Sequence, residues 1–187
     1  EVGIFNEKRN NLDVRYFQIF EKLNMIPILI PNNITLAKKI IKNVKVSGII
    51  LSSGGDALKK DIRYDTEILL LNYAKRNDIP LLGICRGAQA INIYFGGRIK
   101  AIPNHVRKKH TLKSDLTNKK KIKTNCYHDY GIKSDYLGKN LHVLGTSSDD
   151  SIELFKHKSK KIIGMMWHPE RFKKLREFES KIFKRLF

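Results

Sequence analysis

Residues 81–87 read Leu-Leu-Gly-Ile-Cys-Arg-Gly, and a stretch with helical apolar spacing, residues 86–95, begins within it. The apolar run of residues 81–84 predicts a strand buried on both faces, so Cys85 falls on the turn from strand to helix. A nucleophile on such a turn has a strained backbone, and Gly83 and Gly87 keep the positions two residues away small. We expect the helix dipole to favour the thiolate and lower the pKa of Cys85. The stretch predicts a catalytic cysteine; the alternative is a small buried core cysteine.

Strand-like and helix-like segments alternate through the first half of the chain. The expected strands are residues 2–5, 26–30, 48–51 and 81–84. The expected helices are residues 12–23, with Asn10 or Asn11 as N-cap, and residues 34–44, 65–76 and 86–95. Strands that are apolar on both faces and alternate with helices indicate a parallel sheet covered by helices on both sides.

The second half is expected to extend this sheet with strands that are joined by turns. These strands are residues 122–125, 142–146, 152–155 and 162–167, and a closing helix follows at residues 172–187. The polar, lysine-rich residues 107–123 are expected to form a mobile loop. Because there is no repeat, low-complexity segment or linker, we expect residues 1–187 to form a single domain.

A second motif lies far downstream of the cysteine: residues 162–170 read Ile-Ile-Gly-Met-Met-Trp-His-Pro-Glu. An apolar strand ends at His168, and Pro169 favours an extended backbone for the residue before it. In extended chain, residues two apart point the same way, so His168 and Glu170 are expected to project together. This is how a catalytic base and the carboxylate that orients it are arranged. A His-x-Glu pair by itself is more often a surface coincidence.

A third motif, Leu-Ser-Ser-Gly-Gly-Asp at residues 51–56, follows another strand. Paired glycines allow a backbone N–H to turn toward a ligand. The N–H of Gly55 or Gly54, together with that of Arg86, is therefore a candidate oxyanion hole. The alternatives are an ordinary turn or a phosphate-binding loop, although the spacing of a P-loop is missing.

The net charge of +19 raises the question of a nucleic-acid partner. Lysines and arginines are scattered along the chain and no nucleic-acid-binding motif is present, so we expect no nucleic acid; an anionic small-molecule substrate suits the charge equally well. No apolar stretch is long enough for a membrane span, and we expect no membrane association. Cys85 and Cys126 do not form a disulfide framework. With no signal peptide in view, a cytoplasmic location is expected.

Taken together, residues 83–89 and 164–170 resemble the nucleophile and His-Pro-Glu motifs of class I glutamine amidotransferases and their γ-glutamyl hydrolase relatives. The resemblance covers nearly the whole chain. It implies a flavodoxin-like three-layer α/β sandwich whose mostly parallel central sheet has an antiparallel extension. It also implies a triad of Cys85, His168 and Glu170 that hydrolyses a γ-glutamyl amide through a thioester, with no cofactor. The family likeness makes substrate contacts of four further residues: Gln89, Asn125, Tyr127 and His128. An exposed helix side chain and a loop histidine are the alternatives for Gln89 and His128.

Residues 6–13, 104–110 and 127–131 resemble a subgroup of the family found with nucleotide-sugar and capsule assembly enzymes. This likeness implies a nucleotide-linked substrate, CDP-L-glutamine, cleaved to cytidine diphosphoramidate and glutamate. The residues Arg9, His105 and Arg107 are then candidates for phosphate contact, with solvated loop charges as the alternative.

Other functions stay open at this point. One is a glutaminase that passes ammonia to a separate synthase, and another is a general γ-glutamyl peptide or amine hydrolase. A third is a binding protein on the same fold that is attracted to nucleic acid. We expect no metal site, because His105 and His110 lack a third ligand nearby. Cys126 lacks the glycines of residues 83–87 and is expected to be a packed free thiol.

Overall fold

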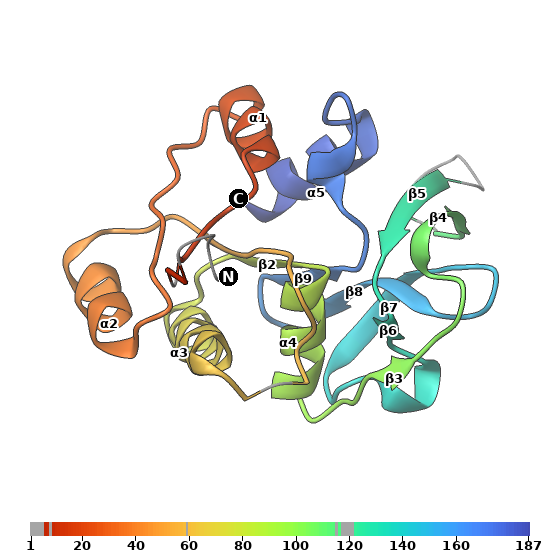
Figure 1. The fold of residues 1–187 in the computed structure, drawn as a ribbon, viewed down its shortest axis with the longest axis horizontal. Coiled ribbons are helices and arrows are strands. Elements are labelled where there is room, and N and C mark those ends of the chain that lie inside the picture. Colours follow the sequence, from red (N-terminus) through yellow and green to blue (C-terminus); the bar gives the residue numbers. More distant parts are fainter. Residues whose placement is uncertain (1–5, 8, 59, 115, 117–121) are drawn as a thin grey trace.

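A mixed five-stranded sheet forms the centre of the protein (Figure 1), which is described here by a computed structural model covering residues 6–7, 9–58, 60–114, 116 and 122–187. In spatial order the strands are β1 (Ile49–Leu51), β2 (Leu81–Ile84), β9 (Ile162–Met165), β8 (Ile152–His157) and β7 (Leu141–Thr146). The pairs β1–β2 and β2–β9 are parallel, whereas β8–β9 and β7–β8 are antiparallel. Because β2 and β9 are parallel neighbours, the two motifs that follow them start at the same edge of the sheet.

Helices cover both faces of this sheet. On one face lie α1 (Arg15–Lys22) and α5 (Glu177–Leu186), whose apolar side chains share a core with Leu82, Ile84 and Met165. On the other face α2 (Ile34–Asn43), α3 (Ile62–Asn77) and α4 (Arg86–Tyr94) share a second core with Leu81 and Ile162. The alternation of Leu81 and Leu82 between two cores explains why this strand is apolar throughout.

Two small antiparallel sheets lie beside β7 and β8. One is the pair β4 (Val106–Leu112) and β5 (Ile122–Tyr127), and the other is β3 (Lys100–Ala101) with β6 (Tyr130–Gly131). Single bridges, Lys113 to Thr146 and Ile132 to Ile152, connect them to the central sheet. Two 3-10 turns complete the described elements, η1 (Ser134–Tyr136) and η2 (Pro169–Arg171). Among the described residues, no helix combines the length and apolarity that crossing a membrane requires.

The α/β class with a mixed central sheet confirms the fold expected from sequence. The closing helix begins at Glu177, five residues later than expected, and three further local predictions are wrong. Residues 26–30 form no strand, because an apolar run provides no hydrogen-bonding neighbour by itself; Ile26 is 92% exposed. The first helix begins at Arg15 after Val14, which makes no side-chain cap, while Asn10 accepts a hydrogen bond from the Asn32 N–H. The expected strand at residues 2–5 lies outside the described residues.

The third correction concerns the expected loop at residues 107–123. Residues 107–112 belong to β4 and residues 122–123 to β5, in register from Val106–Tyr127 to Leu112–Ile122. Most side chains of β4 are exposed to solvent, so lysines are tolerated in this strand. The strand therefore lacks the alternation of apolar and polar residues by which strands are recognised in sequence.

Candidate active site

Cys85 lies on a sharp turn between β2 and α4, in a conformation that few non-glycine residues adopt. Its φ is 50° and its ψ is −102°, and its N–H donates to the Met165 carbonyl of β9 at 2.7 Å. A Cβ on Gly83 would lie 2.4 Å from the Gly87 backbone, and one on Gly87 would lie 2.2 Å from the Leu51 oxygen. Both glycines are therefore required by close backbone approaches around the cysteine, as the sequence motif indicates.

The acidity of the Cys85 thiol differs from the expectation. The pKa of this thiol is raised to about 12, first by burial and then by the negative charge of Glu170, and the Arg86 backbone N–H offsets the rise only in part. The helix N-terminus alone thus does not produce a thiolate in the free protein, and the expected lowering is wrong. A thiol in this environment needs a base to remove its proton during the reaction.

His168 and Glu170 form a buried pair at the end of β9. Nδ1 of His168 lies 2.7 Å from Oε1 of Glu170. The Asn125 side chain holds the histidine backbone at both polar groups: its amide donates to the His168 carbonyl and its oxygen accepts from the His168 N–H, each at 2.8 Å. Nε2 of His168 is buried and has no hydrogen-bond partner among the described residues. With Nδ1 directed at the carboxylate, Nε2 is the nitrogen available for proton transfer.

Glu170 lies in the 3-10 turn η2, so extended alternation is not what brings it to His168, although the backbone of His168 itself is extended. Two residues that the sequence analysis missed also hold the carboxylate. Ser53 donates its hydroxyl to Oε1 of Glu170 at 3.1 Å, and the Tyr16 hydroxyl in turn donates to Ser53 Oγ at 3.1 Å. Oε1 therefore accepts from a serine while it faces the imidazole, and a hydrogen-bonded chain from α1 orients the pair.

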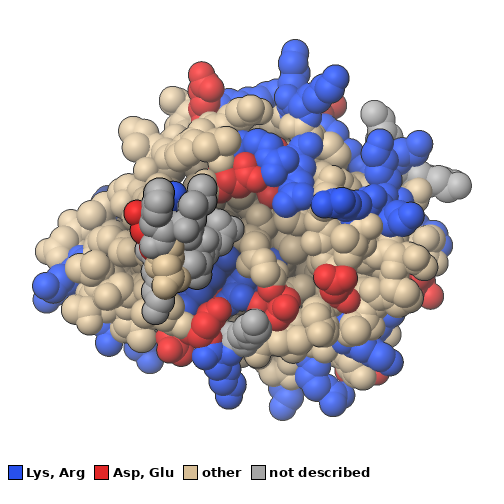
Figure 2. Space-filling view, viewed as in Figure 1, with Lys and Arg blue, Asp and Glu red and all other residues tan. Residues whose placement is uncertain are grey.

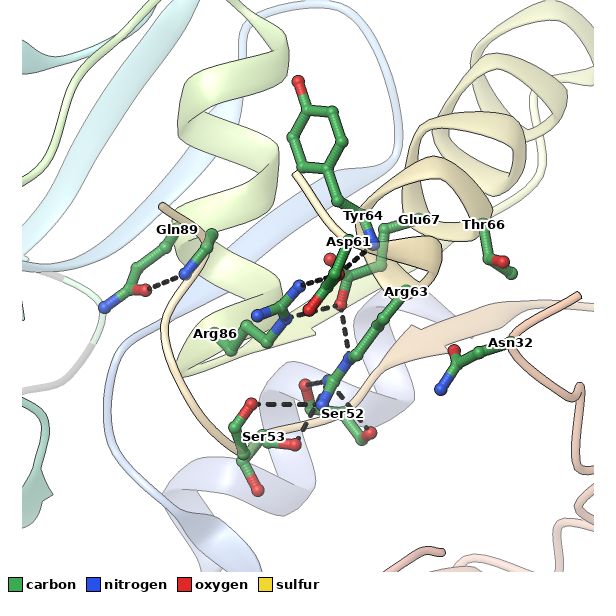
Figure 3. Close-up of polar contacts among 12 residues, drawn as sticks. Asn32, Ser52, Ser53, Asp61, Arg63, Tyr64, Thr66, Glu67, Arg86 and Gln89 are labelled. Carbon is green, nitrogen blue, oxygen red and sulfur yellow. Dashed lines mark hydrogen bonds and ion pairs between the residues drawn. The ribbon is translucent and has the colours of Figure 1, made fainter. Parts of the chain in front are cut away.

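The loop of residues 52–56 is held in place by the side chains of two arginines from neighbouring helices, Arg63 and Arg86, which Figure 3 shows. Arg63 of α3 donates to the carbonyls of Ser52, Ser53 and Gly54, at 2.6, 3.1 and 3.1 Å. Arg86 donates through its side chain to the Asp56 carbonyl. All these hydrogen bonds are accepted by backbone carbonyls of the loop. Gly54 and Gly55 both have positive φ, 111° and 69°, a conformation that glycine adopts without strain.

Buried Glu67 links the two guanidinium groups that grip this loop. Its Oε1 accepts from Arg63 Nε at 2.9 Å and from Arg86 Nε at 3.2 Å (Figure 3). Asp61, the N-cap of α3, accepts from Arg86 as well, at 3.2 Å. The loop is therefore positioned by a network of charges rather than by its own backbone alone.

A cleft of about 900 Å³ opens over these groups. It is lined by side chains or backbone of Cys85, His168, Arg86, Ser52, Ser53, Gly54, Gly55, Arg9, Tyr127 and Arg171, among others. The Tyr127 and His168 rings pack in a T-shaped arrangement with centroids 5.5 Å apart, and the Arg171 guanidinium lies 4.0 Å over the Tyr127 ring. Sequence analysis missed Arg171, although it directly follows the His-Pro-Glu motif. Its buried Nε has no hydrogen-bond partner among the described residues.

Of the expected substrate contacts, Arg9 and Tyr127 line this cleft, whereas five other residues do not line it: Gln89, Asn125, His128, His105 and Arg107. The Gln89 amide is buried and bonded at both ends, accepting from the Ala57 N–H at 3.1 Å and donating to the Tyr130 carbonyl at 3.0 Å. Arg107 is exposed at the irregularity of β4.

His105 and His128 are buried together with Cys126 and Glu153, in a second group that has the composition of a Cys-His-Glu triad. The Cys126 sulfur lies 3.2 Å from Nδ1 of His105 and 3.0 Å from Nε2 of His128. Cys126 is a buried free thiol, as expected, and the structure adds that polar side chains surround it.

Comparison with known proteins identifies the family of the chain. Residues 13–187 match the family model described as "Glutamine amidotransferase class-I". The chain belongs to the class-I glutamine amidotransferase family. It is an enzyme of the cysteine-dependent type that hydrolyses a glutamine amide, with a Cys-His-Glu triad.

Three individual proteins illustrate what the chain is similar to within and beyond its sequence. The chain is 34% identical to the gamma-glutamyl-CDP-amidate hydrolase of Campylobacter jejuni, over 89% of this chain and 84% of that protein. It is 32% identical to the glutamine-hydrolysing GMP synthase subunit of Methanococcus vannielii, over 78% of this chain and 75% of that protein. A solved structure assigned as a GMP synthase subunit, from Thermoplasma acidophilum, superimposes with a TM-score of 0.73 at 22% identity, covering 92% of this chain and 85% of that one. The last similarity concerns the fold alone.

Proposed function

We propose that Cys85, His168 and Glu170 are the catalytic triad, and that the enzyme cleaves a γ-glutamyl amide through a thioester on Cys85. The observation that carries this assignment concerns His168, a residue that lines the same cleft as Cys85: its Nδ1 is held by Glu170, while its Nε2 has no hydrogen-bond partner among the described residues. The Cys85 thiol is protonated in the free protein, and this imidazole is the base that the reaction requires.

In the first step Nε2 of His168 takes the thiol proton, and the Cys85 sulfur forms a bond to the γ-carbonyl carbon of the substrate. The Arg86 N–H and the N–H of Gly55 or Gly54 stabilise the resulting oxyanion. The C–N bond then breaks, and His168 returns the proton to the departing nitrogen. Water, deprotonated by His168, attacks the thioester, which releases glutamate and restores the thiol.

Cys126 is the competing nucleophile, because it too lies beside histidines and a glutamate. It is buried within β5 and does not line the cleft, whereas Cys85 does. Burial raises the pKa of Cys126, and the adjacent carboxylate of Glu153 raises it further. A diazoketone analogue of glutamine tests the choice: we expect one covalent adduct, located on Cys85 by peptide mass spectrometry. An adduct on Cys126, with Cys85 unmodified, would reverse the assignment.

We further propose that the substrate carries a nucleotide on the amide nitrogen, with CDP-L-glutamine as the specific candidate and cytidine diphosphoramidate as the second product. The similarity to gamma-glutamyl-CDP-amidate hydrolase supports this, as do the cationic side chains of Arg9 and Arg171 in the cleft. Asn125 binds the backbone of His168, and Gln89 binds the backbone of Ala57 and Tyr130, so we assign both side chains positioning roles. A comparison of glutamate release from CDP-glutamine, glutamine and γ-glutamyl amines tests the substrate, with Cys85→Ala as the blank.

A glutaminase subunit that supplies ammonia to a synthase is the second candidate, supported by the similarity to the glutamine-hydrolysing GMP synthase subunit. Such a subunit would release ammonia from glutamine and gain activity with a synthase partner. Turnover of CDP-glutamine by the isolated chain, with glutamine hydrolysed poorly, would exclude it.

A further inference from the structure

The second Cys-His-Glu group joins three parts of the fold in one buried cluster. His105 directly precedes β4, Cys126 belongs to β5, His128 directly follows β5, and Glu153 belongs to β8. One donor atom from each of the four side chains lies within 4.8 Å of the other three. Besides the two sulfur–imidazole contacts, Oε1 of Glu153 lies 3.6 Å from Nδ1 of His105 and 3.9 Å from Nε2 of His128. The four atoms thus surround one small volume.

In this arrangement the carboxylate of Glu153 is only partly satisfied. Oε1 of Glu153 is buried and accepts no hydrogen bond from any described residue. The nitrogens that face it are Nδ1 of His105 at 3.6 Å and Nε2 of His128 at 3.9 Å, both too distant for a hydrogen bond. A buried carboxylate that lacks a counter-charge is strongly destabilising, and a bound cation would remove this cost.

In each of the two histidines, the ring nitrogen that points away from the cluster contacts an oxygen atom, as is usual for metal-bound histidines. Nε2 of His105 lies 3.2 Å from a carboxylate oxygen of Asp149, and Nδ1 of His128 lies 2.9 Å from the Tyr130 carbonyl. Such contacts fix the tautomer, so the lone pairs of His105 Nδ1 and His128 Nε2 point toward the cluster. Asp149 is itself oriented by Ser151, which donates its hydroxyl at 2.9 Å.

We propose that His105, Cys126, His128 and Glu153 bind one Zn²⁺ ion, which fastens the β4–β5 hairpin to β8 of the central sheet. Tetrahedral zinc with thiolate, imidazole and carboxylate ligands has neighbouring donor atoms about 3.3 to 3.6 Å apart. Four of the separations in this cluster lie around that range, at 3.0, 3.2, 3.6 and 3.9 Å. A thiolate with two imidazoles favours zinc over magnesium or calcium, which prefer oxygen ligands. The ion binds as the Cys126 thiol releases its proton to solvent.

Four protein ligands leave zinc no open position, so the ion has a structural role. That role reaches the active site through the neighbouring residue: Asn125, adjacent to Cys126 in β5, holds the backbone of His168 from both sides. Zinc would thereby fix the strand that positions the proposed base. Sequence spacing did not reveal the site because its ligands come from distant segments of the chain.

The two cysteines provide a matched pair for the test, read out as metal content and independent of catalysis. Protein purified without chelators, or stripped and incubated with ZnSO₄ and then desalted, is analysed by inductively coupled plasma mass spectrometry. We expect about one zinc ion per wild-type chain, unchanged in Cys85→Ala and lost in Cys126→Ala. Zinc at less than about a tenth of an equivalent in reconstituted wild type, or equal zinc in both cysteine variants, would overturn the proposal.

Because loss of a ligand can also unfold the chain, a second measurement uses Asp149, which contacts the ligand His105 but is not itself a ligand. Asp149→Asn keeps all four ligands and should weaken zinc affinity about 10- to 100-fold in a chelator competition. His142→Ala, which removes an exposed histidine of β7, serves as the control and should leave the affinity unchanged. Stripped wild type should also gain thermal stability on addition of Zn²⁺ but not of Mg²⁺. An affinity that is unaffected by Asp149→Asn, or no stabilisation by Zn²⁺, would contradict the proposed site.

Discussion

At the scale of single residues, the nucleophile is placed by backbone geometry and the base by side-chain contacts. Cys85 has a strained backbone that Gly83 and Gly87 permit, while His168 is oriented by Glu170 and held by Asn125. The cysteine and its glycines are contiguous in sequence, so the motif could be recognised directly. The contributions of Tyr16 and Ser53 could not, because they depend on where α1 packs.

The proposed triad should respond unequally to substitution. Cys85→Ala should lower kcat/KM about 10⁴-fold or more with the fold retained, and His168→Asn should be nearly as damaging, because the base activates the thiol and protonates the leaving group. Glu170→Gln should be about a hundredfold less damaging, since this residue orients the imidazole without transferring a proton. Steady-state glutamate release, with circular dichroism as the check on folding, measures the series. A harmless Glu170→Gln would show that the contact with His168 is not used.

The raised pKa of Cys85 predicts how the free enzyme reacts with iodoacetamide. A thiol with a pKa of about 12 stays protonated near neutrality, so its alkylation rate should rise about tenfold per pH unit from about pH 7 to pH 9. Peptide mass spectrometry separates this reaction from that of Cys126. A rate that levels off near neutral pH would instead indicate a thiolate already formed in the resting protein.

At the scale of elements, sequence patterns identified the strand that is buried on both faces and failed for the strand that has one face exposed to solvent. The strand expected at residues 81–84 was found to the residue and the helix expected at residues 34–44 to within one residue, because apolar spacing is a local signal. The hairpin strand β4 was missed because lysines occupy it, and the apolar residues 26–30 were taken for a strand that has no described partner. Pairing is a property of two segments and cannot be read from one.

The C-terminal helix α5 is fixed to the sheet by a buried carboxylate that offers an element-scale prediction. Oε1 of Glu179 accepts from the indole N–H of Trp167 at 3.0 Å, and Oε2 accepts from Arg176 Nε at 2.9 Å. Glu179→Gln removes the charge at constant shape and should lower the free energy of unfolding by about 1 to 3 kcal/mol. Glu177→Gln, at an exposed residue of the same helix, should change it by less than about 0.5 kcal/mol. Urea denaturation measures both, and equal effects would refute a specific role for Glu179.

At the scale of the whole molecule, parallel pairing of β2 with β9 unites motifs that are distant in sequence. The register pairs Ile84 with Met165, so the residues that follow them, Cys85 and His168, reach the same cleft. The family resemblance implied this meeting, whereas spacing alone could not. Figure 2 shows lysine and arginine side chains at many separate places on one face of the molecule, with acidic side chains between them. The basic residues behind the net charge of +19 are thus not gathered into a single stripe on the face shown.

The last prediction connects this charge with the proposed nucleotide-linked substrate. If the pyrophosphate contributes binding energy that positions the γ-carbonyl, truncation to glutamine should lower kcat as well as raise KM, and kcat/KM should fall at least about a hundredfold. Salt screens exposed charges over about 8 Å at physiological ionic strength, so added NaCl should raise KM for CDP-glutamine and hardly change it for uncharged γ-glutamyl amides.

Arg171→Gln provides the molecular test of the same idea, since its guanidinium lines the cleft beside Tyr127. This change should reduce kcat/KM for CDP-glutamine and weaken its salt dependence, because one cation that faces the phosphates is gone. Lys181→Gln, on the exposed surface of α5 away from the cleft residues, is the matched control and should behave as wild type. Equal kcat/KM for CDP-glutamine and glutamine in the wild-type enzyme would argue against a nucleotide-linked substrate. The proposed triad would then serve a general glutaminase, since both reactions break the same γ-glutamyl C–N bond.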